Sequence, residues 1–459
     1  MITKIYIHGF KSFYNFEMEF SPLTVIAGLN ASGKSNLFDA LMLLSKLAEV
    51  DNIKKAFKEQ RGEFSELFTQ LAEGRYADEM RFGVEMLVNK TIRDAWGNES
   101  KLKYTRLRYE LTIRRITTES GIDNLIVAEE SLTNLKHNQD KWLNSIPKAY
   151  REIWRPKVLS GRRSTPYMYT DKSDIPTVIV PQDGGGGNKR KFPLRNSTRT
   201  VLSTFDTVDF PHVLAAREEM RNWRFLQLNP SELRKPTPKD TGDDKISTTG
   251  EHMAGALFRM HRQNAGVLKD ISRKLQSFLP EFIAVKVEDD KENKQYIIHL
   301  EDRDKKTYSS RVLSEGTLRI LALCILAFDE QYSGLLCFEE PENGVHPQRM
   351  KDMMQLLKEL STDFKNEYEP LRQVIVNTHS PILLQHFSQS LNDSLTSIWY
   401  AQMKNIITDT PIGRSKISAT EILPVSESIQ FEAFPISEAK QKIALATVKE
   451  YLATAISQN

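Results

Sequence analysis

The stretch Gly28-Leu29-Asn30-Ala31-Ser32-Gly33-Lys34-Ser35 decides the fold of this 459-residue chain. It fits the phosphate-loop pattern G-x-x-x-x-G-K-[ST], in which backbone N–H groups and a lysine bind phosphate oxygens. The apolar run over residues 23–27 that precedes it is typical of a buried parallel strand. The apolar residues from Leu37 to Ala48 recur at helical spacing. The pattern therefore has the strand–turn–helix context that it requires.

A second informative stretch, Leu313-Ser314-Glu315-Gly316-Thr317, opens an apolar helical run that continues to Phe328. Serine is a good helix N-cap, and a turn of this kind leaves backbone N–H groups accessible to an anion. Taken alone, a plain helix start explains this turn at least as well as a phosphate contact does.

Two further apolar strands end in polar residues. Glu339 and Glu340 follow the first strand, and Pro341 ends it. Two adjacent carboxylates at a strand end point in different directions, so one can face a Mg²⁺ ion and the other an attacking water. His379 follows the second strand, Val374-Ile375-Val376, and is placed to hydrogen-bond a γ-phosphate.

The composition is that of an ordinary globular protein, with 40% hydrophobic and 27% charged residues and a net charge of +3. The two cysteines, Cys324 and Cys337, lie in apolar runs and indicate a reducing compartment. The clean apolar run Ile320–Phe328 is too short to span a membrane, and the N-terminus lacks a signal-peptide layout. These features predict a cytoplasmic protein without a membrane partner.

The charge is unevenly distributed. Residues 148–199 contain twelve Lys/Arg and four Asp/Glu, which makes this segment strongly basic. Contact with DNA phosphates is one explanation, and a solvated loop is the other. Residues 155–203 read as irregular, and 235–250 read as a loop rich in Pro, Asp, Thr and Gly.

The rest of the pattern predicts an α/β fold. We expect strands over 2–27, an antiparallel meander over 104–135, helices over 251–279, a strand pair at 282–287 and 296–300, and an amphipathic helix over 437–456. No sustained heptad pattern is present, so a long coiled-coil arm is not expected.

These motifs, in this order, resemble the ABC-type ATPases of the SMC/RecF/OLD-like group, which belong to the AAA-family "predicted ATPases". The resemblance covers roughly residues 1–115 and 205–400, including Asn377-Thr378-His379-Ser380-Pro381 and the stretch from Glu339 to Pro347. It implies a P-loop NTPase fold of the ABC/SMC-head type. Such a fold has a mixed sheet, an antiparallel β subdomain, and a helical or loop insertion between the phosphate loop and the serine-glycine turn.

The resemblance also implies a domain organisation and a set of nucleotide contacts. The expected parts are an N-terminal ATPase lobe (1–135), an inserted helical and basic region (136–280), a C-terminal ATPase lobe (281–400) and a C-terminal extension (401–459). The residues expected to bind ATP are Gly28, Asn30, Ala31, Ser32, Gly33, Lys34, Ser35 and Asn36 of the phosphate loop, with Ser314, Glu315 and Gly316 of a second copy.

The implied chemistry is Mg²⁺-dependent ATP hydrolysis. Ser35 and Glu339 are the expected Mg²⁺ ligands, Glu340 is the expected catalytic carboxylate, and His379 is the expected switch residue. Asn343 would lie at the seam between two subunits.

The chain departs from the group in small ways and leaves some contacts open. Glu339 stands where Asp is usual, and Ala31 replaces a common Gly. Gln60 and Gln70 are candidates for the glutamine that usually joins the site, and Lys11 or Phe13 for the adenine contact.

Two functions fit these features. In the first, the chain is the sensor or scaffold ATPase of a prokaryotic anti-phage defence system and acts as a homodimer or larger oligomer with a separately encoded effector. In the second, it is a RecF-like repair ATPase that clamps double-stranded DNA. A transporter is disfavoured by the absence of a membrane segment, and a nuclease is disfavoured because residues 382–459 contain no Asp-x-Asp.

Overall fold

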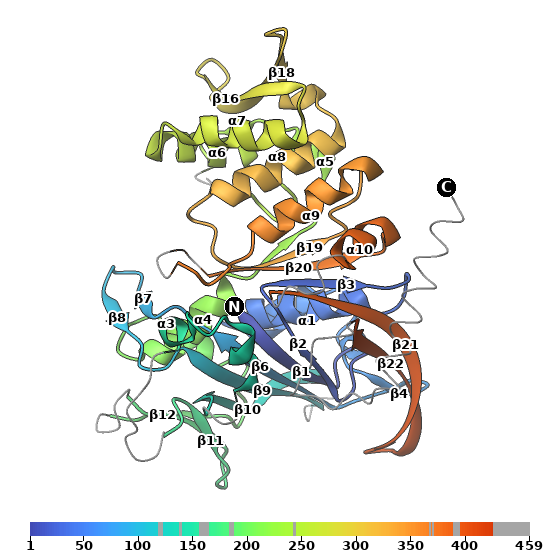
Figure 1. The fold of residues 1–459 in the computed structure, drawn as a ribbon. Helices are drawn as coiled ribbons and strands as arrows, with labels where there is room; N and C mark the ends of the chain where they lie inside the picture. Colours follow the sequence, from blue (N-terminus) through green and yellow to red (C-terminus); the bar gives the residue numbers. More distant parts are fainter. Residues whose placement is uncertain are drawn as a thin grey trace.

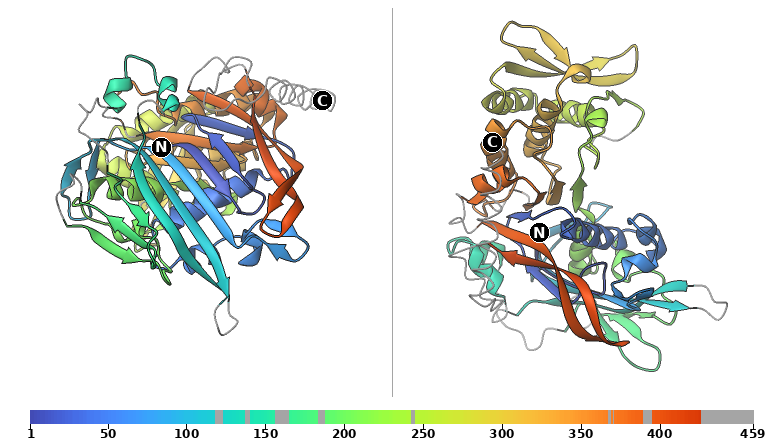
Figure 2. Two further views of the ribbon diagram at one scale, coloured as in Figure 1. Left: turned by 90° about the horizontal axis from the view of Figure 1, so that it is seen from below. Right: turned by 90° about the vertical axis from the view of Figure 1, so that its right-hand side faces the viewer.

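The computed structural model describes residues 1–117, 123–136, 140–155, 165–182, 188–241, 245–366, 369, 371–388 and 395–425. A six-stranded sheet crosses the middle of the molecule, with a five-stranded antiparallel sheet below it and a helical part above it (Figure 1). Figure 2 shows the same arrangement from below and from the side.

The six-stranded sheet has the order β14-β19-β20-β3-β21-β22. Its strands are β14 (Arg224–Leu226), β19 (Gly334–Glu339), β20 (Arg372–Thr378), β3 (Leu23–Ala27), β21 (Thr396–Thr410) and β22 (Gly413–Pro424). The first five strands run parallel, and β22 returns antiparallel to β21. All five residues of β3 are buried, as a strand covered on both faces requires.

The second sheet is fully antiparallel and has the order β10-β9-β6-β1-β2. Its strands are β10 (Asp123–Asn134), β9 (Arg106–Thr117), β6 (Glu79–Leu87), β1 (Ile2–His8) and β2 (Phe16–Glu19). Helix α1 (Lys34–Leu47) lies between the two sheets (Figure 1) and shares one hydrophobic core with both.

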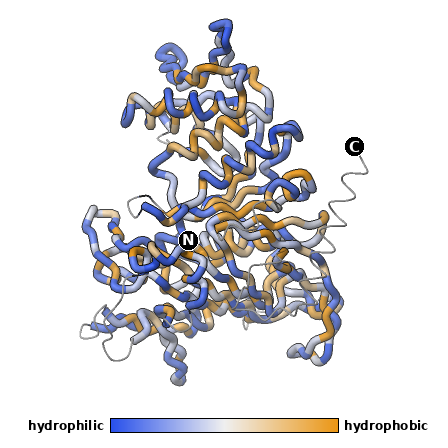
Figure 3. The backbone as a smooth tube through the Cα atoms, in the orientation of Figure 1, coloured by the Kyte–Doolittle hydropathy of each residue, from blue (hydrophilic) through white to orange (hydrophobic). Residues whose placement is uncertain are grey.

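The upper part packs helices against a small sheet. The helices are α5 (Pro230–Leu233), α6 (Met253–Gln263), α7 (Val267–Phe278), α8 (Glu315–Phe328), α9 (Met350–Glu359) and α10 (Pro381–Ser388). The sheet contains β15 (Thr237–Pro238), β16 (Phe282–Asp290), β17 (Gln295–Asp302) and β18 (Thr307–Ser309). Helix α8 is apolar on nearly all sides and lies at the centre of this second core (Figure 3).

Shorter elements complete the described chain. They are α2 (Ile53–Lys58), α3 (Arg151–Trp154), α4 (Pro211–Arg221), β4 (Gln70–Ala72), β5 (Arg75–Tyr76), β7 (Thr91–Arg93), β8 (Glu99–Lys101), β11 (Tyr169–Asp171), β12 (Thr177–Val180) and β13 (Arg190–Pro193). Within the described ranges, no helix is long and apolar enough to cross a membrane.

Most of the predicted elements are confirmed, including the strands over 2–27, the meander over 104–135 and the helices over 251–279. The prediction of an irregular stretch over 155–203 is wrong in part, because β11, β12 and β13 form a three-stranded antiparallel sheet there. Period-2 alternation in Thr177–Val180 was hidden by the flanking basic and glycine residues. The helix expected over 437–456 lies outside the described residues.

A buried ion cluster joins the segment before α3 to the antiparallel sheet. The Arg106 guanidinium donates two hydrogen bonds of 3.0 Å to the Asp140 carboxylate, and Arg155 donates a third of 2.6 Å. The Asp140 side chain is fully buried, and Arg106 is 1% exposed. Because one carboxylate balances two buried cations, this cluster has strong consequences for stability.

We expect Asp140→Ala to lower the free energy of unfolding by about 3–5 kcal/mol, because it leaves two buried guanidinium groups without a counter-charge. Urea denaturation followed by circular dichroism measures this loss. Glu99→Ala breaks the exposed pair between Arg93 and Glu99 and is the matched control, with an expected loss below about 1 kcal/mol. Equal losses in the two variants would contradict the assignment.

Candidate functional site

The parallel sheet brings the predicted motifs to one edge. Ala27 pairs with Thr378, and Asn377 pairs with Glu339, so β3, β20 and β19 end side by side. Because the carboxyl ends of parallel strands meet at one edge, the loop 28–33, the Glu339–Glu340 pair and His379 are neighbours.

The backbone of the loop after β3 needs small residues. Gly28 has φ +153° and Gly33 has φ +85°, conformations that L side chains rarely adopt. A Cβ on Gly33 would lie 1.8 Å from Thr420 Oγ1, and a Cβ on Gly28 would lie 2.5 Å from the Ala401 carbonyl oxygen. The glycines of the motif are therefore required by packing against β21 and β22 as well as by the turn.

Ala31 is a further residue of the loop with positive φ, at +62°. In the resembled group a glycine is common here, and this geometry explains the preference. An L-residue in the left-handed region costs roughly 1–2 kcal/mol, so Ala31 adds strain to the loop.

Lys34 begins α1 and folds back over the loop. Its ammonium donates to the Gly28 carbonyl at 2.7 Å and to the Leu29 carbonyl at 2.8 Å. Burial lowers the pKa of the Lys34 ammonium, and the charges of Glu340 and Glu342 partly oppose this effect. The cation thus lies where a phosphate oxygen would have to be neutralised.

The other loop residues separate into two groups. Asn30 and Ala31 are exposed, and Ser32 is buried. The Asn36 side chain donates to Ser12 Oγ at 2.7 Å, and Ser12 Oγ lies 2.6 Å from Thr420 Oγ1. Asn36 therefore links the first turn of α1 to the turn after β1 and to β22, a network that the sequence alone did not indicate.

Ser35 and Glu339 lie together, as expected for two ligands of one ion. Glu339 is hydrogen-bonded to the Ser35 hydroxyl, and Asn377 Nδ2 lies 3.5 Å from Ser35 Oγ. Burial raises the pKa of the Glu339 carboxyl, while the Arg61 charge and the Ser35 hydroxyl lower it. A carboxylate and a hydroxyl oxygen are hard donors that suit Mg²⁺.

The backbone turns sharply at Glu340, which has φ +48°. The two carboxylates have different partners: Glu339 is hydrogen-bonded to Ser35, and Glu340 contacts the residues below. Glu340 Oε1 lies 2.9 Å from His379 Nδ1, and Asn343 Nδ2 donates to Glu340 Oε2 at 2.7 Å. The predicted catalytic pair is therefore in contact.

Two charged residues at this edge, Arg61 and Asp39, escaped the sequence reasoning. Arg61 donates to Asp39 at 2.8 Å, and Lys11 donates to the other oxygen of Asp39 at 2.7 Å. The Arg61 charge also acts on Glu339. No motif pointed to this pair, because the structure alone brings α1 and the segment after α2 together.

Another glutamine fits the position beside the acidic strand better than the two candidates do. Both side-chain polar atoms of Gln60 are buried without a hydrogen-bond partner, and Gln70 lies in β4. Gln227 follows Leu226, which pairs with Phe338, and so lies next to Glu339. It lines a cavity of about 690 Å³ together with Asp39, Arg61 and Glu339. In the sequence, the signal that could have identified Gln227 is its position directly after the apolar pair Phe225-Leu226.

The two residues considered for the adenine contact are both engaged. Phe13 is fully buried, with its ring centroid 4.4 Å from that of Phe16, so it does not reach a bound base. Lys11 pairs with Asp39, but it also lines a second cavity of about 690 Å³ with Asn36, Tyr76 and Lys416.

The serine-glycine turn belongs to the upper part of the molecule. Ser314 caps α8, accepting a hydrogen bond of 3.3 Å from the Thr317 N–H, and its side chain is exposed. Gly316 packs so closely that a Cβ there would lie 2.5 Å from the Gly344 carbonyl oxygen. Glu315 accepts from Arg319 at 3.0 Å, so its carboxylate is held along the helix.

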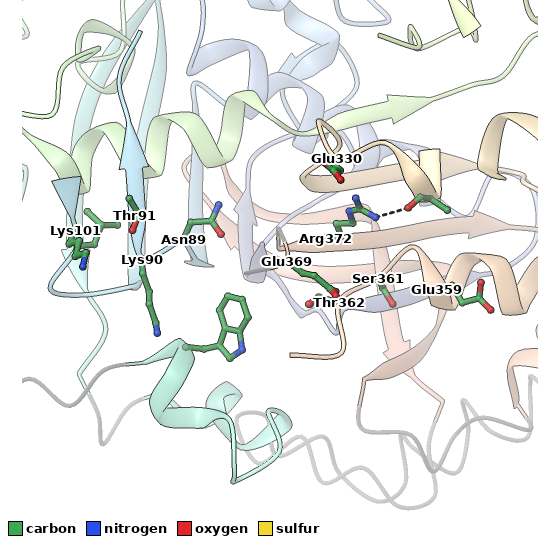
Figure 4. A pocket seen from close by; sticks show the side chains of 13 residues that line it. Asn89, Lys90, Thr91, Lys101, Glu330, Glu359, Ser361, Thr362, Glu369 and Arg372 are labelled. Atoms are coloured by element: carbon green, nitrogen blue, oxygen red, sulfur yellow. Dashed lines mark hydrogen bonds between the residues drawn. The ribbon is translucent and has the colours of Figure 1, made fainter. Parts of the chain in front are cut away.

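A cavity of about 1240 Å³ lies elsewhere, between residues 89–102 and 327–372 (Figure 4). The Arg372 guanidinium on its wall donates to the carbonyls of Tyr332, Ala327 and Asp329, each at 3.0 Å. This arginine supports the fold, and none of the predicted site residues lines the cavity.

The family described as "AAA ATPase domain" matches residues 1–157, and the family described as "AAA domain, putative AbiEii toxin, Type IV TA system" matches residues 160–385. Together these two matches cover most of the chain, which is an ATPase of the AAA family. The first family holds the phosphate loop of the ATPase, and the second holds the serine-glycine turn, the acidic strand and His379. No curated protein sequence matches the ATPase significantly.

Heads of SMC proteins are among the solved structures that match the chain. An SMC head bound to the C-terminal winged-helix domain of ScpA is 15% identical, with a TM-score of 0.49, covering 93% of the ATPase and 99% of that chain. The SMC head of Thermotoga maritima is 14% identical (TM-score 0.37), with the same coverage of 93% and 99%. The Pyrococcus furiosus SMC head is 12% identical, with a TM-score of 0.45. This match covers 92% of the ATPase and 96% of the SMC head chain.

We expect Lys34→Ala to lower the affinity for ATP by at least roughly 10-fold, because the loop loses its charge-assisted hydrogen bonds to phosphate. Binding of a fluorescent ATP analogue measures the effect. Lys55→Ala changes an exposed lysine on the neighbouring helix α2 and is the control that should bind normally. Unchanged affinity in Lys34→Ala would remove the loop from the site.

Proposed function

We propose that two copies of this ATPase close over two Mg²⁺-ATP molecules. Each copy contributes the loop 28–35, Glu339, Glu340 and His379 to one site. It contributes Ser314, Glu315 and Gly316 to the site of its partner, while Ser35 and Glu339 hold the Mg²⁺ ion.

The surface around both halves of the site supports closure. Leu29 in the phosphate loop is 60% exposed, and Val312, two residues before Ser314, is 70% exposed. A second copy that packs against these two side chains would remove their apolar surface from water. Ser314 itself is exposed at the N-terminus of α8, where its turn can face an anion on another copy.

We further propose that the closed dimer is the sensor or scaffold of an anti-phage defence system and acts with a separately encoded effector. The match over residues 160–385 to a family described by a toxin and a toxin–antitoxin system supports this role. Phage plating on cells that express the ATPase with its neighbouring gene tests it, with Lys34→Ala as the inactive variant. Equal plating on both strains would contradict the role.

Clamping of DNA is the alternative, and the basic segment favours it. Lys189, Lys191 and Arg195 are exposed. Arg190 lies over the Phe205 and Phe210 rings, at 5.5 and 4.8 Å from their centroids, so part of its surface is occupied. Lys157, Arg162 and Arg163 lie outside the described residues.

For dimer closure, we expect Glu340→Gln to bind ATP and hydrolyse it roughly 10²- to 10⁴-fold more slowly, which should trap the closed dimer. Adding Ser314→Arg should prevent closure without loss of ATP binding, because the bulky cation fills the seam. Analytical ultracentrifugation with ATP measures both outcomes. Ser277→Arg on the exposed face of α7 is the control and should still dimerise. A dimer that persists with Ser314→Arg would contradict the shared site.

For the clamp, we expect Lys189→Ala with Lys191→Ala to weaken binding to a DNA duplex and to reduce its salt dependence by about two phosphate contacts. Fluorescence anisotropy across a salt series measures this. Lys291→Ala with Lys294→Ala, in the exposed turn between β16 and β17, removes the same charge at a distant place. Absence of DNA binding by the native ATPase at low salt would leave the defence role alone.

A further inference from the structure

Glu342 is a buried carboxylate in the turn that follows Glu340. Glu342 is 7% exposed. Two backbone hydrogen bonds close the turn, from the Asn343 N–H to the Glu340 carbonyl at 3.1 Å and from the Val345 N–H to the Glu342 carbonyl at 2.9 Å. Two backbone hydrogen bonds thus hold the turn around a charged group for which the sequence predicted no role of its own.

Glu342 is hydrogen-bonded to the end of the strand that precedes His379. The Thr378 hydroxyl donates to Glu342 Oε1 and accepts from the Ser380 N–H at 2.9 Å. Thr378 is fully buried at the end of β20. His379 is therefore flanked on both sides by residues that this one hydroxyl group holds.

The same connection continues into α10. Ser380 Oγ accepts from the Leu383 N–H at 3.2 Å, and its carbonyl accepts from the Leu384 N–H at 3.1 Å. The residues after His379 are therefore anchored to the first turn of a helix, so a shift of Thr378 would carry the histidine with it.

The second oxygen of Glu342 is buried without a hydrogen-bond partner. Burial raises the pKa of the Glu342 carboxyl, the Thr378 hydroxyl lowers it, and the charges of His379 and Glu340 act on it in opposite directions. A carboxyl group that is only half satisfied costs stability, so its presence beside two reactive residues needs a functional explanation.

The direct contact between Glu340 and His379 is too exposed to fix their geometry alone. His379 and Glu340 are 44% and 40% exposed, and exposed ion pairs contribute little. The hydrogen bond between Glu342 and Thr378 is shielded from water and joins the same two loops. A buried charge-assisted hydrogen bond resists displacement better than an exposed one.

We propose that Glu342 is a positioning residue for ATP hydrolysis: through the Thr378 hydroxyl it holds His379 at the correct place beside Glu340. The inference rests on the roles proposed for Glu340 and His379. Glu342 touches neither the nucleotide nor the water; it sets the distance between the acidic turn and the histidine strand.

Steady-state ATP hydrolysis tests this. We expect Glu342→Ala and Thr378→Val each to lower kcat by roughly 10- to 100-fold, the range for residues that orient functional side chains. KM for ATP should stay within about threefold, because neither residue belongs to the loop 28–35. Glu342→Gln keeps a carbonyl acceptor and Thr378→Ser keeps a hydroxyl donor, so both should retain most of kcat.

A double-mutant cycle separates positioning from general destabilisation. The variant with both Glu342→Ala and Thr378→Val should be no slower than the slower single variant. Each single variant already breaks the hydrogen bond between Glu342 and Thr378, so the second substitution removes nothing more. Thr396→Val alters an equally buried threonine of the same sheet and should leave kcat unchanged. Thermal unfolding of every variant checks that each one folds.

The outcomes distinguish this inference from the function on which it rests. Any of three results would overturn the role of Glu342. The losses of kcat in the two single variants could multiply in the double variant, only KM could change, or Thr378→Ser could lose as much kcat as Thr378→Val. If Glu340→Gln hydrolyses ATP normally, the proposed catalytic residue is wrong, and that result is separate from the cycle.

Discussion

The parallel pairing of β3 with β20, and of β20 with β19, is the constraint on which the site depends. Three segments, one ending at Ala27 and the other two at Glu339 and Thr378, end at one sheet edge because their strands share one direction and one register. A slip of one residue would turn every side chain of a strand to the other face. All five residues of β3 are packed in the core, so the geometry of the polar site depends on how the surrounding hydrophobic residues hold this strand.

The site combines buried charges, such as Lys34 and Asp39, with the more exposed charges of Arg61, Glu340 and His379. The charges of Glu340 and Glu342 act on Lys34, while Arg61 and Lys11 share Asp39. Charges of both signs therefore lie close to the sheet edge. A triphosphate with Mg²⁺ brings both signs together, so it can enter this arrangement without leaving a buried charge uncompensated. The left-handed backbone at Ala31 and Glu340 shows where strain is retained to shape that arrangement.

The upper and lower parts of the chain contribute different halves of the proposed reaction. The acidic turn joins them, because Gly344 packs against Glu315 and Gly316 while Glu342 bonds to the strand that leads to His379. One short turn therefore contacts both the residues proposed to act within a subunit and those proposed to act on its partner. In the proposed function, closing a dimer and orienting the hydrolytic residues would both depend on the position of residues 341–345.

The sequence by itself determined the phosphate loop, the acidic strand end, the histidine strand and the family, because these motifs are short and their spacing reflects local backbone geometry. It also predicted β3, α1, α7 and α8 from hydrophobic periodicity. Only the tertiary structure decided the roles of Arg61, Gln227, Thr420 and Glu342, because these residues meet the site through packing between distant elements. The three strands over 169–193 were likewise missed, since basic and glycine residues masked a short alternating pattern whose pairing partners no local signal identifies.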